Sequence, residues 1–203
     1  MIAVLTGDII KSQEIAAPSI WLDRLKIALN FLSKEEFWSI YRGDSFQLEI
    51  GNPRKAFIAA IYIKACIKTI KDLDIRIAIG LGNKEHQGKD VSESNGPAFV
   101  YSGETLEQLK KEKTNLKLKS DNPIFNDEIN LYFKLLLIGI DHWTVNSAEV
   151  VKLTIENPNM LQTELAKLIG TSQNAVSKRQ KRANLDEIFA LDKMYNSKLK
   201  KFL

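Results

Sequence analysis

The stretch QTELAKLIGTSQNAVSKRQKR, residues 162–182, contains two short helical patterns separated by a glycine. Leu165, Ala166 and Ile169 give the first pattern one apolar edge. Gly170 follows where the C-terminus of a helix needs a residue at positive φ, a conformation that costs glycine little. Ser172 can accept a hydrogen bond from a free backbone N–H, so it predicts the start of a second helix.

These positions fall in the register of a helix-turn-helix, in which the second helix enters the major groove of DNA. Ala166 is small where the two helices must cross closely, and Val176 anchors the second helix. The alternative is an ordinary helical hairpin with a basic, solvated face. One position departs from the motif, because Gln180 stands where a further apolar residue is expected. We therefore expect the second helix to rest on Val176 and Ala183 and to pack less firmly than usual.

The outward positions of the second helix are polar or basic. Asn and Gln side chains can pair with adenine edges, and Lys can reach guanine or phosphate. Arg adds charge against the DNA backbone. The pattern predicts a surface for double-stranded DNA that consists of Ser172, Gln173, Asn174, Ser177, Lys178, Arg179, Lys181 and Arg182.

The excess positive charge lies in the last third of the chain. Residues 144–203 contain 10 Lys or Arg and 6 Asp or Glu, whereas residues 1–143 contain 19 of each. A basic segment around a predicted recognition helix is the electrostatic pattern of a DNA-binding module. A chance imbalance of this size is the alternative, so the charge supports the motif without establishing it.

Cysteine, histidine and apolar segments limit the class of protein. Cys66 is the single cysteine, so no disulfide within the chain is possible and a reducing compartment is expected. His86 and His142 are far apart in the sequence and have no cysteine partners, which argues against a zinc site. No signal peptide is evident, and the longest apolar run, residues 135–140, is too short to span a membrane. We therefore expect a cytoplasmic protein without a membrane partner.

Upstream of the helix-turn-helix, apolar and β-branched runs predict strands. Residues 2–10 (IAVLTGDII) predict a central strand, and residues 37–50 predict a hairpin with its turn at Arg42-Gly43-Asp44. Residues 75–82 (IRIAIGLG) predict a strand whose second face carries mostly alanine and glycine, which leaves room for a ligand or a close-packed partner. Residues 116–119 predict an edge strand.

Helical patterns alternate with these strands. The first begins at Pro18 and carries an apolar stripe, the second begins at Pro53, and the third lies within residues 94–113 and runs through Leu106 and Leu109. The stripe of the first helix comprises Ile20, Leu25, Ala28, Leu29 and Leu32. The order strand, helix, strand, strand, helix, strand, helix, strand is that of a ferredoxin-like domain.

The sequence thus predicts an α+β protein with a ferredoxin-like domain followed by an all-α helix-turn-helix domain. We expect a ligand-sensing domain over residues 1–120, a connector helix over 121–143 and the DNA-binding domain over 144–203. Thr144 is expected to cap the supporting helix of that last domain. A C-terminal helix then follows, which could pack on the domain or form a helix-helix contact between two copies of the chain. Because a single helix-turn-helix reads few base pairs, a homodimer is expected.

Two aspartates are expected to meet at one end of the sheet. In a ferredoxin-like sheet the first strand is antiparallel to the third, which brings Asp8 beside Asp44. Two such carboxylates repel each other unless a cation or proton lies between them, and oxygen ligands suit Mg²⁺ bound with a phosphate. Lys11, Arg42 and Arg76 are candidate ligands for that phosphate. The alternative is ordinary turn chemistry, since Gly-Asp in a hairpin needs no metal.

The motifs TGDIIKS, YRGDSFQLEI, RIAIGLG and SNGPAF resemble the catalytic palm domain of class III nucleotidyl cyclases. RGDSF is also similar to the signature turn of diguanylate cyclases, with Arg42 and Ser45 as departures. The resemblance implies metal binding by Asp8 and Asp44. Other cyclase positions differ: Ile40 and Tyr41 replace a purine-selecting Lys. Val100 and Glu104 stand where the Asn and Arg that stabilise the transferring phosphate would fall.

Over nearly its full length the chain resembles the bacterial SatD family, through TGDI, RGDSFQ and QTELAKLIGTSQNAVSKRQKRAN. This resemblance implies architecture more than activity.

Three functions follow as expectations. The first is a cytoplasmic DNA-binding transcriptional regulator whose palm domain binds a nucleotide or phosphate ligand, with Mg²⁺ as a possible cofactor. The second is a nucleotide cyclase-like phosphotransferase with a DNA-binding accessory domain. The third is a module whose palm domain binds only a protein. The missing transition-state donors favour the first over the second, so no catalytic residue is assigned, and the bare strand face weakly disfavours the third.

Overall fold

A computed structural model of the chain describes residues 1–15 and 17–202, and shows an α+β fold with a five-stranded mixed sheet. Its strands are β1 (Ile2–Ile10), β2 (Trp38–Tyr41), β3 (Ser45–Ile50), β4 (Asp74–Gly82) and β5 (Leu116–Lys119). The described residues form eight α-helices: α1 (Ser19–Leu32), α2 (Ala56–Lys68), α3 (Pro97–Glu112), α4 (Pro123–Ile140), α5 (Val145–Glu156), α6 (Gln162–Ile169), α7 (Gln173–Arg182) and α8 (Leu185–Phe202). Short 3₁₀ turns lie at Ser12–Glu14, Glu35–Phe37 and Pro53–Lys55.

The strand order is β2-β3-β1-β4-β5, with β1 in the centre. β1 is antiparallel to β3 and to β4, and β5 is parallel to β4. The predicted strands and hairpin are therefore present, and the turn lies at residues 42–44 as expected. In this register Asp8 is opposite Ser45 on one side and Arg76 on the other. The ends of β1 and β3 thus meet where the sequence predicted.

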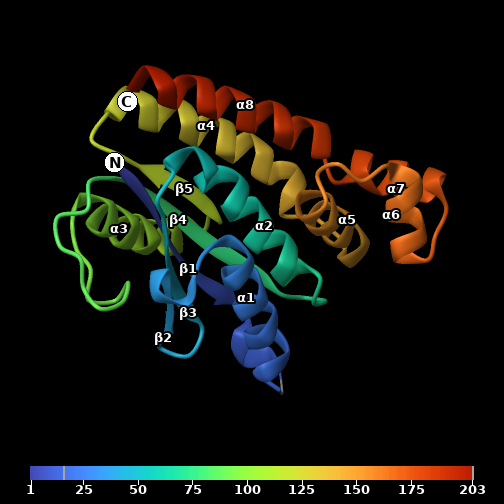
Figure 1. Cartoon of the computed structure of the whole chain (residues 1–203), viewed down its shortest axis with the longest axis horizontal. Coiled ribbons are helices and arrows are strands. Elements are labelled where there is room, and N and C mark those ends of the chain that lie inside the picture. The colour runs from blue at the N-terminus through green and yellow to red at the C-terminus, as the bar shows by residue number, and fades with distance from the viewer. Residues whose placement is uncertain (16, 203) are drawn as a thin grey trace.

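Helices cover the two faces of the sheet unequally. α1 and α2 pack on one face and α3 packs on the other (Figure 1). In α1 the buried side chains are those of Trp21, Leu25, Ala28 and Leu29, whereas Ile20 is 52% exposed. The expectation that Ile20 joins the buried stripe was wrong, because the stripe continues from Leu25 back to Trp21, one full turn earlier.

Helix α3 packs closely on the face of β4 that carries Gly80 and Gly82. A Cβ atom added to Gly80 would lie 2.0 Å from the carbonyl oxygen of Ala98 and 2.6 Å from the amide nitrogen of Ser102. Gly82 meets the amide nitrogen of Ala98 in the same way, at 2.8 Å. Of the two alternatives for this face, the close-packed partner is therefore the one observed, and the partner is a helix of the same chain.

The edge of the sheet at β5 is covered by asparagine side chains from α4. Asn130 accepts from the Leu118 amide at 2.7 Å and donates to the Leu118 carbonyl at 2.8 Å. Asn126 makes the same pair of contacts with Ser120. These amides replace the hydrogen bonds that a sixth strand would make, so the edge is closed to pairing with another strand.

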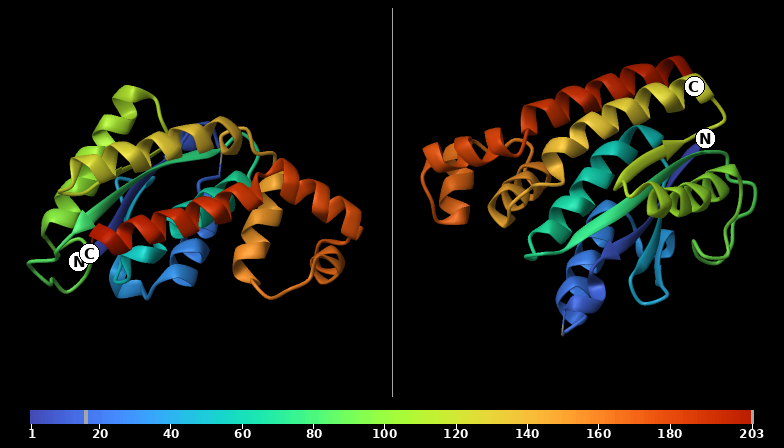
Figure 2. Two further views of the ribbon diagram at one scale, coloured as in Figure 1. Left: turned by 90° about the horizontal axis from the view of Figure 1, so that it is seen from above. Right: turned by 180° about the vertical axis from the view of Figure 1, so that it is seen from behind.

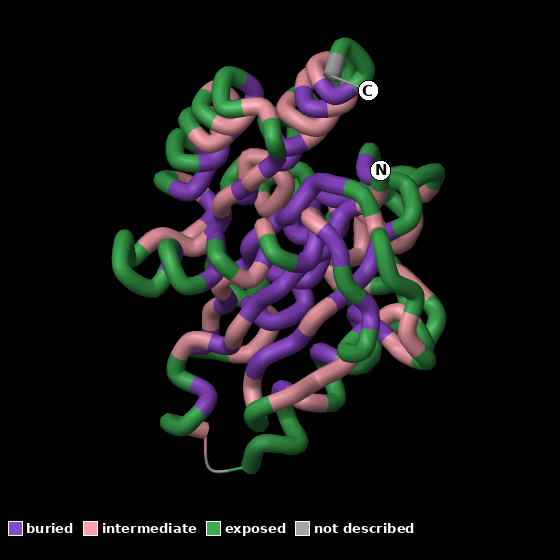
Figure 3. The backbone as a smooth tube through the Cα atoms, turned by 90° about the vertical axis from the view of Figure 1, so that its left-hand side faces the viewer, coloured by how far each residue is buried: buried purple, intermediate pink, exposed green. Residues whose placement is uncertain are grey.

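α4 and α8 lie side by side above α2, at the top of Figure 1. The rings of Phe57 in α2 and Phe133 in α4 stack at 5.1 Å, and the Tyr195 hydroxyl of α8 donates to the Pro53 carbonyl at 2.8 Å. The apolar stripes of both helices face inward, and the C-terminal helix packs within its own chain. One buried cluster runs from the sheet to α8 (Figure 3).

Two buried lysines of α2 join the sheet to the end of α4. Nζ of Lys64 lies 2.6 Å from Asp74 Oδ1 and 2.7 Å from Asp141 Oδ1, although Lys64 is almost fully buried. Lys68 binds Asp74 at 3.1 Å and donates to the Asp141 carbonyl at 2.8 Å. Paired charges of this kind make the position of α4 relative to α2 and β4 specific.

Among residues 1–15 and 17–202, no helix is long and apolar enough to cross a membrane.

Candidate functional site

Helices α5, α6 and α7 project from one end of the molecule, beyond the sheet (Figure 2). The predicted caps of α5 and α7 are both confirmed. Thr144 Oγ1 accepts from the Ser147 amide at 3.2 Å, and Ser172 Oγ accepts from the Ala175 amide at the same distance. α5 is tied to the body of the protein by Tyr62, whose hydroxyl donates to Glu156 at 2.6 Å.

The turn between α6 and α7 depends on Gly170. It has φ 72° and ψ 42°, the left-handed conformation predicted for it, and its N–H closes the end of α6. The next amide, of Thr171, donates back to the Ala166 carbonyl at 2.8 Å. A side chain at 170 would be strained in this conformation, so glycine allows α7 to turn away immediately after α6.

The two helices are held by the small and apolar residues that the sequence singled out. Leu165, Ala166, Val176 and Ala183 are all buried. Trp143, at the end of α4, donates from Nε1 to the Ala183 carbonyl at 3.0 Å. The position of α7 is thereby linked directly to the helix that covers the sheet.

Gln180 takes a place where an apolar residue was expected. Its Oε1 accepts from Gln162 of α6 at 2.8 Å, and its Nε2 donates to Thr154 Oγ1 of α5 at 3.2 Å. The side chain therefore connects α7 to both neighbouring helices. The sequence showed the departure at this position but not its partners, which lie 18 and 26 residues away.

The outward face of α7 is a continuous polar surface. Seven of the eight predicted DNA-contacting residues are exposed: Ser172, Gln173, Asn174, Ser177, Lys178, Lys181 and Arg182. The eighth, Arg179, is half-buried and its Nη1 lies 3.1 Å from Glu149 of α5. Within residues 1–15 and 17–202, Lys178, Lys181 and Arg182 form no ion pair, while Arg179 holds α7 against α5.

At the other candidate site, Asp8 lies on the face of the sheet that α3 covers. Nε of Arg76 is 3.4 Å from Asp8 Oδ1, and neither atom has a hydrogen-bond partner within the described part of the chain. Burial raises the pKa of the Asp8 carboxyl above its ordinary value, and the Arg76 guanidinium offsets part of that rise. Lys110 of α3 also lowers the pKa, whereas Asp44 raises it, so the two carboxylates lie within electrostatic reach of each other.

Asp44 faces a different neighbourhood. Its Oδ2 accepts from Ser12 Oγ at 2.6 Å, and its carbonyl accepts from the Ile9 amide at 3.1 Å. It lines a cavity of about 330 Å³ with Arg42, Ser12 and Trp21, the last of which is buried. Trp21 Nε1 has no hydrogen-bond partner among the residues described. The sequence showed no functional signal at Trp21, which looked like one more apolar helix position.

The three candidate phosphate ligands are dispersed. Lys11 pairs with Glu14 at 3.3 Å, Arg42 is exposed in the hairpin turn, and Arg76 is engaged by Asp8. The described residues contain no group of three or more His, Cys, Asp or Glu that could hold a metal ion. Of the two positions where a cyclase carries its transition-state donors, Val100 is exposed and Glu104 pairs with Lys119 at 2.6 Å.

Comparison with protein-family models gives no match for this chain, and comparison with curated protein sequences gives none either.

Proposed function

We propose that the chain is a DNA-binding transcriptional regulator, in which α6 and α7 form a helix-turn-helix and α7 contacts the major groove of double-stranded DNA. The observation that carries the proposal is the division of α7 into two faces. Val176 is fully buried, whereas every outward residue except Arg179 is exposed and polar or basic. A helix whose apolar face is buried and whose free cations lie opposite can approach phosphates without losing its own packing.

The experiment is a salt titration of binding to duplex DNA. Lys178→Ala with Arg182→Ala should weaken binding to every duplex and reduce the slope of log K against log salt by about 2. Each phosphate contact that forms on binding releases about one counterion, so a variant with two fewer contacts releases about two fewer counterions. Lys111→Ala is the control, since Lys111 is an exposed lysine of α3 on the far side of the sheet. Absence of binding to genomic DNA at low salt would contradict the proposal.

Sequence preference is tested separately with Asn174→Ala. Asn174 is exposed in the first turn of α7, where a side chain can reach base edges. The variant should lose about 1–3 kcal/mol of discrimination at one base position while its salt dependence stays unchanged. Selection from a random duplex library would show this as relaxed preference at one place in the site.

We further propose that residues 1–120 form a ferredoxin-like palm domain that senses a nucleotide or phosphate ligand, together with Mg²⁺. The strand order and the meeting of Asp8 with the hairpin at Asp44 support this. The cavity of about 330 Å³ beside Asp44 supplies space for a ligand. The exposed Val100 and the paired Glu104 favour binding over catalysis at this site.

Thermal melts with Mg²⁺ and each nucleoside triphosphate test this part. Wild type should be stabilised by RT ln(1 + [L]/Kd), and Asp8→Asn or Asp44→Asn should lose that response. Asp121→Asn is the matched control, because Asp121 is exposed just after β5, at the opposite end of the sheet from Asp8. A wild type that no metal or nucleotide stabilises would contradict the sensor proposal. Product formed in the same mixtures would instead favour the phosphotransferase alternative.

A further inference from the structure

The exposed face of α4 carries an apolar ridge that the chain itself leaves uncovered. Ile124, Leu131, Leu135 and Ile138 are 82%, 56%, 57% and 70% exposed. Their spacing of seven, four and three residues places them along one side of the helix. This α4 ridge lies on the other side of the helix from Phe125, Ile129 and Phe133, which are buried within the chain. The residues of the α4 ridge therefore do not contribute to the buried core of the chain.

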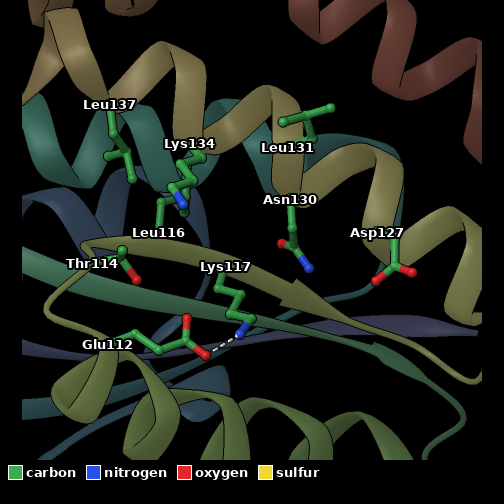
Figure 4. A pocket seen from close by; sticks show the side chains of 9 residues that line it. All are labelled: Glu112, Thr114, Leu116, Lys117, Asp127, Asn130, Leu131, Lys134 and Leu137. Carbon is green, nitrogen blue, oxygen red and sulfur yellow. Dashed lines mark hydrogen bonds and ion pairs between the residues drawn. The ribbon is translucent and has the colours of Figure 1, made fainter.

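A groove runs along each flank of the α4 ridge. One has a volume of about 550 Å³ and lies between α4 and β5, where Asp127, Asn130 and Lys134 point toward the strand (Figure 4). The other has a volume of about 590 Å³ and lies between α4 and α8, lined by Tyr132, Ala190, Leu191 and Met194. In a two-fold interface the same surface of each copy meets the other, so the α4 ridge and its flanking grooves would be present on both sides of the contact.

The charges beside the ridge specify how two copies would meet. Asp127 and Lys134 are both exposed and lie on the same side of α4, two turns apart. An antiparallel pair of α4 helices with its two-fold axis at Leu131 sets Asp127 of each copy beside Lys134 of the other. It also sets Ile124 against Ile138 and Leu131 against itself. A parallel pair would place the side of α4 that carries Asp127 and Lys134 on opposite flanks of the interface in the two copies, so these charges could not pair.

We infer that the α4 ridge is a homodimer interface, formed by antiparallel packing of α4 against α4 of a second copy. The inference does not depend on DNA binding. A monomer that binds DNA would contradict the interface and leave the proposed function standing, and a dimer that does not bind DNA would do the reverse.

Sedimentation of the full chain tests the interface. Wild type should sediment with the mass of a dimer, and Leu131→Glu with Leu135→Glu should sediment as a monomer with an unchanged circular dichroism spectrum. Ile27→Glu is the matched control, because Ile27 is 51% exposed on α1 and should leave the dimer intact. A monomeric wild type, or a double variant that remains dimeric, would overturn the inference.

The direction of packing is tested with charges and with a crosslink. Lys134→Glu should raise the dimer dissociation constant at least tenfold, and adding Asp127→Lys to it should restore dimerisation. Leu131→Cys should crosslink to its copy with a short bis-maleimide, because Cys66, the chain's single cysteine, is buried. Ile27→Cys should not crosslink. Failure of the charge exchange to restore the dimer, or equal crosslinking at both cysteines, would rule out the antiparallel arrangement.

Discussion

Gln162 of α6 donates from Nε2 to Oε1 of Gln180 in α7 at 2.8 Å, and Gln180 Nε2 in turn donates to Thr154 Oγ1 of α5 at 3.2 Å. α6, α7 and α5 are therefore held together by a polar bridge beside their apolar contacts. A half-buried amide with partners on both sides sets the angle between helices more specifically than an apolar side chain can, because hydrogen bonds are directional.

Replacing Gln180 with Ala should lower the free energy of unfolding by about 1 kcal/mol or somewhat more, since it removes two hydrogen bonds and leaves partners unsatisfied. Gln173→Ala is the control, because Gln173 is exposed on the same helix. Urea denaturation measures both. Equal stability of the two variants would show that the bridge contributes nothing, and that Val176 and Ala183 suffice to hold α7.

Two glycines of α3 and β4 should respond to alanine in opposite directions. Gly80→Ala forces a methyl group into the backbone of α3 and should cost about 2–3 kcal/mol. Gly103→Ala, within α3, meets nothing within 4 Å and should stabilise the protein by about 0.5–1 kcal/mol through helix propensity. Thermal or urea unfolding distinguishes the signs. A tolerated alanine at 80 would mean that α3 can shift away from the sheet.

Loss of Lys64 should be among the most damaging changes outside the apolar core. Lys64→Ala leaves the carboxylates of Asp74 and Asp141 without their closest cation, and breaking a buried pair costs about 3–5 kcal/mol. Lys26→Ala, at an exposed position of α1, should change stability by less than about 0.5 kcal/mol. A small effect at Lys64 would show that Lys68 alone can hold both acids.

Asp8 should make stability depend on pH in a specific direction. Its folded pKa is raised by burial, so the folded state binds a proton more tightly than the unfolded state does. The contribution of Asp8 to the free energy of unfolding is most favourable at pH values below its ordinary pKa. This contribution is lost as the pH rises through the raised pKa of the folded state. Wild type should therefore lose stability relative to Asp8→Asn as pH increases across this window. Urea melts in steps of pH measure the difference, and a constant difference would contradict the prediction.

Features that depend on neighbours in sequence could be predicted from the sequence. The glycine turn at 170, the caps at Thr144 and Ser172, and the hairpin turn at 42–44 each need only one or two nearby residues. Apolar and β-branched runs likewise identified β1 and β4 within a residue of their bounds. The exposure of the outward face of α7 could be predicted from helical periodicity, because Val176 specifies which side of the helix faces inward.

The partners of these residues were decided only by the tertiary structure. Asp8 pairs with Arg76 and not with Asp44, Gln180 finds Gln162 and Thr154, and Gly80 meets α3. Each contact joins elements separated by loops or whole helices, and no local pattern specifies which elements will pack. α4 shows this most directly, since its sequence contains two apolar sides. Only packing against α2, β5 and α8 decides which side is buried, because one helix cannot turn both sides toward a single core.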